Sequence, residues 1–186
     1  MIGRMFTFVG GVTGEWRIVR TDSVLGEPLP KASRVEVVNS LVASPPQGAL
    51  WLLRGVTSNE RYVTRGEREL LVAKQPALGR PEAVHAALIP IRKSAAWWEL
   101  TQDERREIFE TRSEHITTGL RYLPAVARRL HHSRDLDEPF DFLTWFEYSP
   151  EQSAAFEELV VSLRTSEEWK YVDREVDIRL VRDAAA

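Results

Sequence analysis

The amino-acid sequence predicts an antiparallel α+β fold. Residues 1–55 are rich in β-branched and aromatic residues, arranged as short runs between Gly or Pro clusters. The later residues follow the order strand, helix, hairpin, helix, strand. No linker or low-complexity tract divides the 186 residues, which suffice for one substantial core or for two small subdomains packed together.

The N-terminal part is expected to form strands at Met5–Val9, Trp16–Arg20, Val35–Val38 and Leu50–Leu53. Residues 10–14 have the sequence Gly-Gly-Val-Thr-Gly, which lacks the spacing of a phosphate-binding loop. We therefore interpret this segment as a hairpin turn between the first two strands.

Two further elements lead to the middle of the chain. Tyr62–Gln75 combines charged residues with recurring apolar positions, which predicts a helix that ends before Pro76. Ala86–Ile91 is a short apolar run between charged flanks, and we interpret it as a buried strand.

Thr101 opens the clearest helix signal in the sequence. Thr101 and Glu104 have the spacing of a capping box, and Asp103 adds negative charge to the first turn. Helical periodicity then directs one stripe toward the core, and this stripe comprises Ile108, Phe109, Arg112, His115, Ile116 and Gly119. We therefore expect His115 on the buried side of this helix.

A hairpin is expected after Pro124. Val126, Arg128 and Leu130 alternate with their neighbours in the period of a strand. Phe140–Tyr148 returns as the second strand, so Arg128 is expected to point inward with its apolar neighbours.

A helix and a strand complete the expected fold. The helix starts at residues 149–152, and its expected buried face comprises Phe156, Leu159, Val160 and Leu163. Val176–Leu180 alternates between apolar and charged residues, which predicts a strand with one face in water.

Composition and charge exclude several classes of protein. A hydrophobic fraction of 43% and a net charge of −3, with both signs interspersed, do not suggest a nucleic-acid or anionic-membrane partner. No apolar run approaches the roughly 20 residues of a membrane span. Met5–Val12 lacks the cleavage site of a signal peptide, so we expect a cytoplasmic location. The absence of Cys excludes disulfides, iron–sulfur clusters and thiolate-ligated haem.

His115 and Arg128 form the most informative pair of candidate site residues. On one continuous helix they would lie about 20 Å apart, at about 1.5 Å per residue. Gly119 and Pro124 break such a helix, so the two residues can face each other across a cavity. This arrangement suits a metal ligand and an anion-binding group. A core histidine and an arginine paired with a protein carboxylate are the alternatives, and the pattern leaves both open.

Other polar residues have simpler interpretations. Core packing accounts for at least one tryptophan of the Trp97–Trp98 pair. His131 and His132 would point to opposite faces of a strand, which makes them a poor metal-binding pair. Glu168 has the pattern of a solvated loop acid.

Three segments together resemble the chlorite dismutase family. They are residues 91–99 (Ile-Arg-Lys-Ser-Ala-Ala-Trp-Trp-Glu), 114–124 (Glu-His-Ile-Thr-Thr-Gly-Leu-Arg-Tyr-Leu-Pro) and 140–147 (Phe-Asp-Phe-Leu-Thr-Trp-Phe-Glu). The sequence is most similar to the short, cytoplasmic and dimeric branch. The resemblance implies ferredoxin-like α+β units whose antiparallel sheets close into a β-barrel flanked by helices. An abbreviated β-rich unit would span residues 1–90, and a haem-binding unit would span residues 91–186.

The resemblance also implies a cofactor site. His115 would be the proximal ligand of haem b, and Glu168 would hold its ring N–H. Lys93 would steady a haem propionate, and Tyr62 would reach a propionate as well. Trp97 would pack beside the proximal pocket.

The implied activity is the conversion of chlorite to chloride and dioxygen, through a ferryl species and a hypochlorite that recombine. Arg128 would attract chlorite and hold the hypochlorite, and Gln75 would be the distal glutamine. A coproheme decarboxylase is an alternative, although such proteins are generally longer and lack the distal arginine. A non-catalytic haem-binding or haem-sensing protein is the other alternative.

Overall fold

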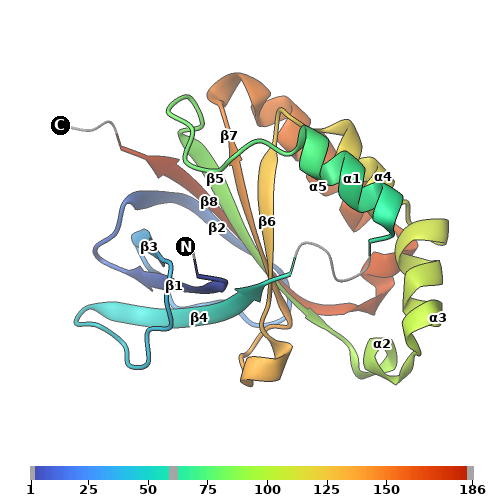
Figure 1. Cartoon of the computed structure of the whole chain (residues 1–186). Coiled ribbons are helices and arrows are strands. Elements are labelled where there is room, and N and C mark those ends of the chain that lie inside the picture. The colour runs from blue at the N-terminus through green and yellow to red at the C-terminus, as the bar shows by residue number, and fades with distance from the viewer. Residues whose placement is uncertain (1–2, 59–62, 184–186) are drawn as a thin grey trace.

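The computed structural model describes residues 3–58 and 63–183, and strands form the centre of the molecule (Figure 1). The strands are β1 (Met5–Gly11), β2 (Trp16–Leu25), β3 (Arg34–Val38), β4 (Ala49–Thr57), β5 (His85–Lys93), β6 (Ala127–His132), β7 (Phe142–Tyr148) and β8 (Val172–Arg182). Within the described residues they close an antiparallel barrel in the order β1-β3-β2-β8-β5-β7-β6-β4.

The barrel consists of two stretches with the same internal order. The N-terminal strands are arranged β4-β1-β3-β2, and the later strands are arranged β8-β5-β7-β6. Each stretch therefore has its own fourth, first, third and second strands side by side, which is the order of a ferredoxin-like unit. The connections within residues 5–57 contain no helix, whereas helices lie between β5 and β6 and between β7 and β8. The expected α+β barrel is confirmed. Residue 90, the expected end of the first unit, lies inside β5.

The helices gather on the outer face of the β5–β8 stretch (Figure 1). They are α1 (Arg65–Lys74), α2 (Ala95–Glu99), α3 (Gln102–Arg106), the π-helix Glu107–Arg112, α4 (His115–Arg121), α5 (Ser153–Arg164) and the 3-10 helix η4 (Glu167–Tyr171). The predicted buried face of α5 is confirmed in full. The helix predicted before Pro76 is also confirmed, with Gln75 as its C-cap.

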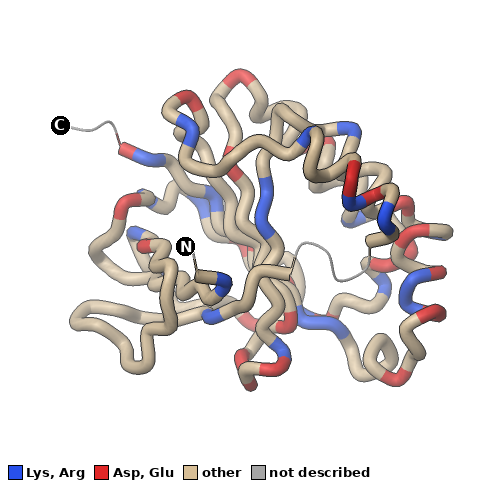
Figure 2. Tube along the Cα trace, in the orientation of Figure 1, with Lys and Arg blue, Asp and Glu red and all other residues tan. Residues whose placement is uncertain are grey.

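Strand alternation divides the core into two layers. Side chains such as Leu143 and Trp145 point into the barrel, whereas Phe146 packs with Phe156 of α5 on the outer side. The same alternation places Arg128 on the outer side of β6 and Arg129 on the side that faces the barrel interior. Figure 2 shows basic and acidic segments interspersed along helices and loops, and a basic segment on β6 in the middle of the sheet.

One predicted connection differs from the structure. Residues 10–14 do not form a hairpin turn, because β3 lies between β1 and β2 in the barrel. Gly14, in the connection from β1 to β2, has a φ of 138°. A Cβ at Gly14 would collide with the backbone of Val35 on β3, the strand that lies between β1 and β2. A local Gly-rich pattern therefore could not reveal that the two strands are not neighbours.

The helix that begins after Thr101 is shorter than predicted. The capping box of Thr101 and Glu104 is present, but the α-helix ends at Arg106 and continues as a π-helix. Glu114 then has a φ of 48°, so His115 begins a new helix instead of lying within the first. Gly119 lies inside that second helix and does not break it.

The last strand has no face in water over Val176–Leu180. Asp177 and Arg179 are buried beneath α5, at 1% and 6% exposure. Ion pairs make this possible, because Arg179 Nε donates to Asp177 Oδ1 at 2.5 Å and Arg164 Nη2 donates to Asp177 Oδ2 at 2.8 Å. Alternating charge here marks a buried polar layer, not a solvated one.

His131 is buried inside the barrel as a neutral residue. Its ring lies 5.0 Å from the ring of Phe6 and 5.1 Å from that of Phe8, and Nδ1 faces the Leu143 carbonyl at 3.2 Å. Burial lowers the pKa of His131 from 6.5 to about 4. Between these two values the unfolded chain binds a proton that the folded chain does not.

We therefore expect His131 to make folding less favourable as pH falls from 6.5 to 4. The loss should be about 3 kcal/mol, from about 1.4 kcal/mol per pKa unit. Urea unfolding of wild type and His131→Gln across this range tests it, and the pH slope should be shallower in the variant. His85→Gln, at a partly exposed histidine, is the matched control. An equal slope in wild type and His131→Gln would contradict the assignment.

Candidate active site

A cavity of about 210 Å³ lies between the outer face of the β5–β8 stretch and helices α1, α4 and α5. Most of its wall is aliphatic or aromatic, including Leu71, Ile89, Ile91, Phe109, Ile116 and Phe146. Polar and charged residues form the rest of the wall, among them Gln75, Arg164 and Glu175. His115 and Arg128, predicted to share a cavity, both line it.

His115 is held by three groups. Its ring stacks on Phe109 with centroids 4.3 Å apart, and its Nδ1 lies 2.6 Å from Glu168 Oε2. The start of its helix is capped by Glu110, whose carboxylate accepts the N–H groups of Ile116 at 2.7 Å and Thr117 at 3.2 Å. The break at Glu114 and the π-helix before it bring Phe109 and Glu110 to these positions. The ring orientation is therefore determined by tertiary contacts.

Glu168 is a buried carboxylate, and each of its two oxygens accepts a hydrogen bond from a different side chain. Oε1 accepts from Lys93 Nζ at 2.6 Å, and Oε2 accepts from His115. Burial alone would raise the pKa of Glu168, but Lys93 and His115 outweigh it and lower the pKa to about 2. An ionised carboxylate only accepts hydrogen bonds, so Nδ1 of His115 carries the proton. In the neutral ring, Nε2 then presents a lone pair for a ligand.

Lys93 and Trp97 lie behind this pair and do not line the cavity. The Lys93 ammonium lies 4.5 Å from the centre of the Trp97 ring, and its side chain is 3% exposed. Lys93 forms an ion pair with Glu168, and its expected contact with a haem propionate stays a prediction. Trp97 is 1% exposed and packs against Tyr171, with ring centroids 5.5 Å apart. Tyr62 lies outside the described residues.

Arg128 enters the cavity from β6. Its guanidinium makes no hydrogen bond or ion pair with any residue in the ranges 3–58 and 63–183. Burial lowers the pKa of Arg128 to about 10, and no carboxylate opposes this effect. The structure therefore does not support the alternative in which Arg128 pairs with a protein carboxylate. An anionic ligand would supply the missing acceptor.

Two residues determine where Arg128 lies. Gln75 ends α1, and its side-chain amide donates to the backbone carbonyl of Arg128. Gly119 faces the guanidinium, where a Cβ would collide with Nη1 and Nη2. Sequence patterns did not identify Gly119, Phe109 or Glu110 as site residues, because each is ordinary in its own helix.

Gly119→Ala should displace the Arg128 guanidinium while the fold is kept. The atoms that the new Cβ would meet are at the end of the flexible Arg128 side chain, so they can move away. Inside a helix, Ala is more stabilising than Gly by about 1 kcal/mol. We expect an unchanged or slightly higher free energy of unfolding and a shifted NMR signal of the Arg128 Nε–H. Gly66→Ala is the control, since a Cβ there meets nothing within 4 Å. An unmoved Arg128 signal in Gly119→Ala would contradict this account.

Comparisons of this chain with a family model, with curated proteins and with solved structures all point to the same family. A family model described as chlorite dismutase matches residues 47–183. A solved structure of a dimeric chlorite dismutase from Nitrobacter winogradskyi is 57% identical, covers 95% of this chain and 99% of its own, and has a TM-score of 0.88. The chlorite dismutase of Ideonella dechloratans is 41% identical over 86 residues, which cover 46% of this chain and 28% of that relative.

More distant structures show the same fold. A chlorite dismutase from Candidatus Nitrospira defluvii in complex with imidazole is 22% identical, covers 95% of this chain and 90% of its own, and has a TM-score of 0.65. Among the described residues, no helix is long and apolar enough to cross a membrane. The matched family model and the 57% identical relative show that this chain belongs to the chlorite dismutase family.

Proposed function

We propose that this chain is a haem b-dependent chlorite dismutase, which converts chlorite to chloride and dioxygen. One observation carries the proposal: the cavity joins a histidine with an available Nε2 to a partly buried arginine that lacks an acceptor among the described residues. Oxygen evolution from chlorite by the haem-loaded protein tests it. Haem-loaded protein that releases no oxygen from chlorite would contradict the proposal.

The donor set fits a haem. A haem iron needs a protein ligand, and His115 offers Nε2 from the wall of a mainly apolar cavity. A carboxylate on the other ring nitrogen is the usual outer-shell partner of a ligating histidine, and Glu168 has this position. Lys93 stabilises the charge on Glu168. When bound, the haem would supply the redox chemistry of oxygen-atom transfer, and the chain would supply ligation and electrostatics.

Arg128 would act on the anions of the reaction. At about 4 Å, with an effective dielectric near 20, a guanidinium and an anion attract each other by roughly 4 kcal/mol. The apolar wall limits water near this charge, so the attraction is stronger than at an exposed site. Arg128 would draw chlorite into the cavity and hold hypochlorite for recombination, and Gln75 would steady the strand that carries it.

We also propose that the protein is a homodimer. The relative from Nitrobacter winogradskyi, described as dimeric, covers 95% of this chain, and this similarity supports the proposal. Mass measurement of the purified protein in solution tests the assembly. The cytoplasmic location stays a prediction from the sequence.

His115→Ala should bind haem weakly or not at all, because the cavity would lose its axial ligand. Glu168→Ala should retain haem with roughly 10–100-fold weaker affinity and a higher reduction potential, since the ring would lose its electron-donating partner. Haem titration followed by the Soret band, together with spectroelectrochemistry, measures both. Full histidine-ligated occupancy in His115→Ala would exclude this ligand assignment.

Arg128→Ala should release less oxygen per chlorite consumed. Without the guanidinium, hypochlorite escapes more often before recombination and bleaches the haem, so the variant should inactivate after fewer turnovers. Adding a hypochlorite scavenger should divert a larger share of product in the variant than in wild type. Arg128→Lys should restore only part of the yield, because an ammonium lacks the planar fork. Equal yields and lifetimes in all three proteins would remove Arg128 from the reaction.

A further inference from the structure

Glu168 depends on a short element for its position. It lies on η4, a 3-10 helix of five residues, which has few internal hydrogen bonds to hold it. Two contacts fix its ends. The Glu168 N–H donates to Ser113 Oγ at 2.9 Å, and the Tyr171 carbonyl accepts from the Ser94 N–H at 2.7 Å. Lys93 Nζ also donates to the Glu168 carbonyl at 3.4 Å, and a further anchor lies at the next residue.

Trp169 supplies that anchor from the other side of η4. Its indole N–H donates to Glu175 Oε2 at 2.8 Å, and its ring lies 5.6 Å from the Lys93 ammonium. Glu175 lies on β8 opposite Ile91 of β5 and is 1% exposed. Trp169 and Glu175 both line the cavity, so this contact is part of the wall behind His115.

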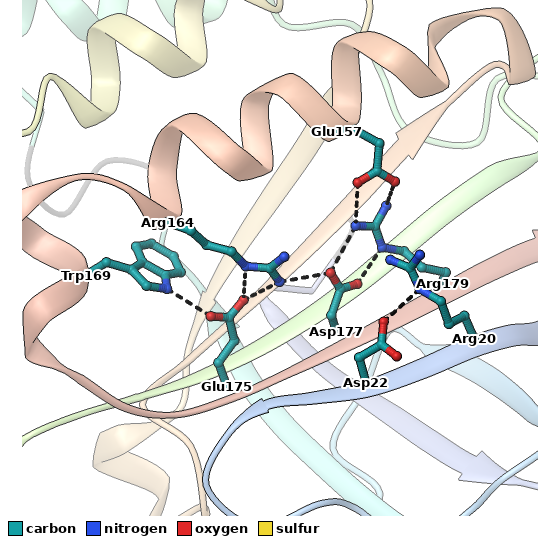
Figure 3. A network of polar contacts seen from close by, with 8 residues as sticks. All are labelled: Arg20, Asp22, Glu157, Arg164, Trp169, Glu175, Asp177 and Arg179. Carbon is teal, nitrogen blue, oxygen red and sulfur yellow. Dashed lines mark hydrogen bonds and ion pairs between the residues drawn. The ribbon is translucent and has the colours of Figure 1, made fainter.

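Arg164 holds the second oxygen of Glu175. Its Nε and Nη2 donate to Oε1 at 2.8 and 2.5 Å, which leaves Oε2 for Trp169. Figure 3 shows Arg164 between Glu175 and Asp177, with Arg179 and then Glu157 beyond. The network therefore has a near end at the cavity and a far end at Glu157, whose side chain is 52% exposed.

The two ends have different roles. Buried ion pairs add little net stability compared with apolar residues of similar size, so stability alone does not account for a charged Glu175 in the wall. A carboxylate that accepts from both Arg164 and Trp169 determines the orientation of the indole, which an apolar residue would not do. The far end joins α5 to β8 and does not touch η4.

We propose that Glu175 is a positioning residue for the proximal side of the site. Through Trp169 it holds η4 so that the Glu168 carboxylate meets Nδ1 of His115. Where it concerns haem, the inference rests on the proposed function. The hydrogen bond between His115 and Glu168 is a property of the chain itself, so it can be followed without haem.

Trp169→Phe tests the inference most cleanly, because it removes the indole N–H and keeps a ring. Glu175→Gln is the second variant. Trp145→Phe is the matched control: the Trp145 indole also donates to a buried carboxylate, Glu147, at 2.8 Å, but inside the barrel. The first measurement, on haem-free protein, is the NMR signal of the His115 Nδ1 proton and its exchange rate. The second, on haem-loaded protein, is the iron–histidine stretching frequency and the reduction potential.

Trp169→Phe and Glu175→Gln should both shift the proton signal upfield, speed its exchange and lower the stretching frequency. Their haem dissociation constants should rise by less than the roughly 10–100-fold expected for loss of Glu168. Trp145→Phe should lower the melting temperature and leave these signatures unchanged. Unchanged signatures in Trp169→Phe or in Glu175→Gln, or equal shifts in Trp145→Phe, would overturn the inference. If wild type fails to bind haem, the proposed function fails, and the haem-free measurement still decides this inference.

Discussion

The buried Glu168 carboxylate is the interaction on which the site depends. It would be unstable alone at 4% exposure, yet it stays ionised because Lys93 and His115 each lie 2.6 Å from one of its oxygens. That charge determines that Nδ1 of His115 carries the proton, which leaves Nε2 as the nitrogen that can bind a ligand. Ser113, Trp169 and the turn η4 all serve to bring this carboxylate to the histidine.

Strand geometry explains how Arg128 reaches the cavity wall opposite His115. Adjacent residues of β6 point to opposite sides, so Arg128 reaches the cavity and Arg129 reaches the barrel interior. Gly119 leaves room for the guanidinium on α4. A partly buried cation that has no acceptor among residues 3–58 and 63–183 is unfavourable, and binding of an anion would relieve this. Under the proposed function, His115 on one wall would bind the iron and Arg128 on the other would bind an anion.

Local patterns could predict most of the fold. The buried stripe of α5 and the inward position of Arg128 follow from periodicities of 3.6 and 2 residues, and both match the structure. The break at Glu114 could not be predicted in this way, because a left-handed glutamate has no sequence signature. The prediction of a solvated face on β8 was also wrong. Asp177 and Arg179 are buried there because Arg164 and Glu157 of α5 form ion pairs with them.

Sequence periodicity predicted less of the candidate site than of the fold. Glu168 has the pattern of a surface acid, and its partner Lys93 lies 75 residues away. Only the family resemblance indicated Glu168, and it did not indicate that Lys93 is paired with it. Contacts between distant segments depend on how the barrel closes, which no short pattern contains. For the same reason Glu110 and Glu175 emerged only from the structure.

The central claim is that His115 binds the haem iron and that Arg128 holds an anion across the same cavity. A crystal structure of the haem-loaded ferric protein with a small inert anion, such as fluoride or thiocyanate, tests both halves directly. The account predicts that Nε2 of His115 coordinates the iron, that Nδ1 stays on Glu168, and that the Arg128 guanidinium donates to the anion on the opposite face. Iron bound by another residue, or Arg128 turned out of the cavity while the anion is bound, would contradict it.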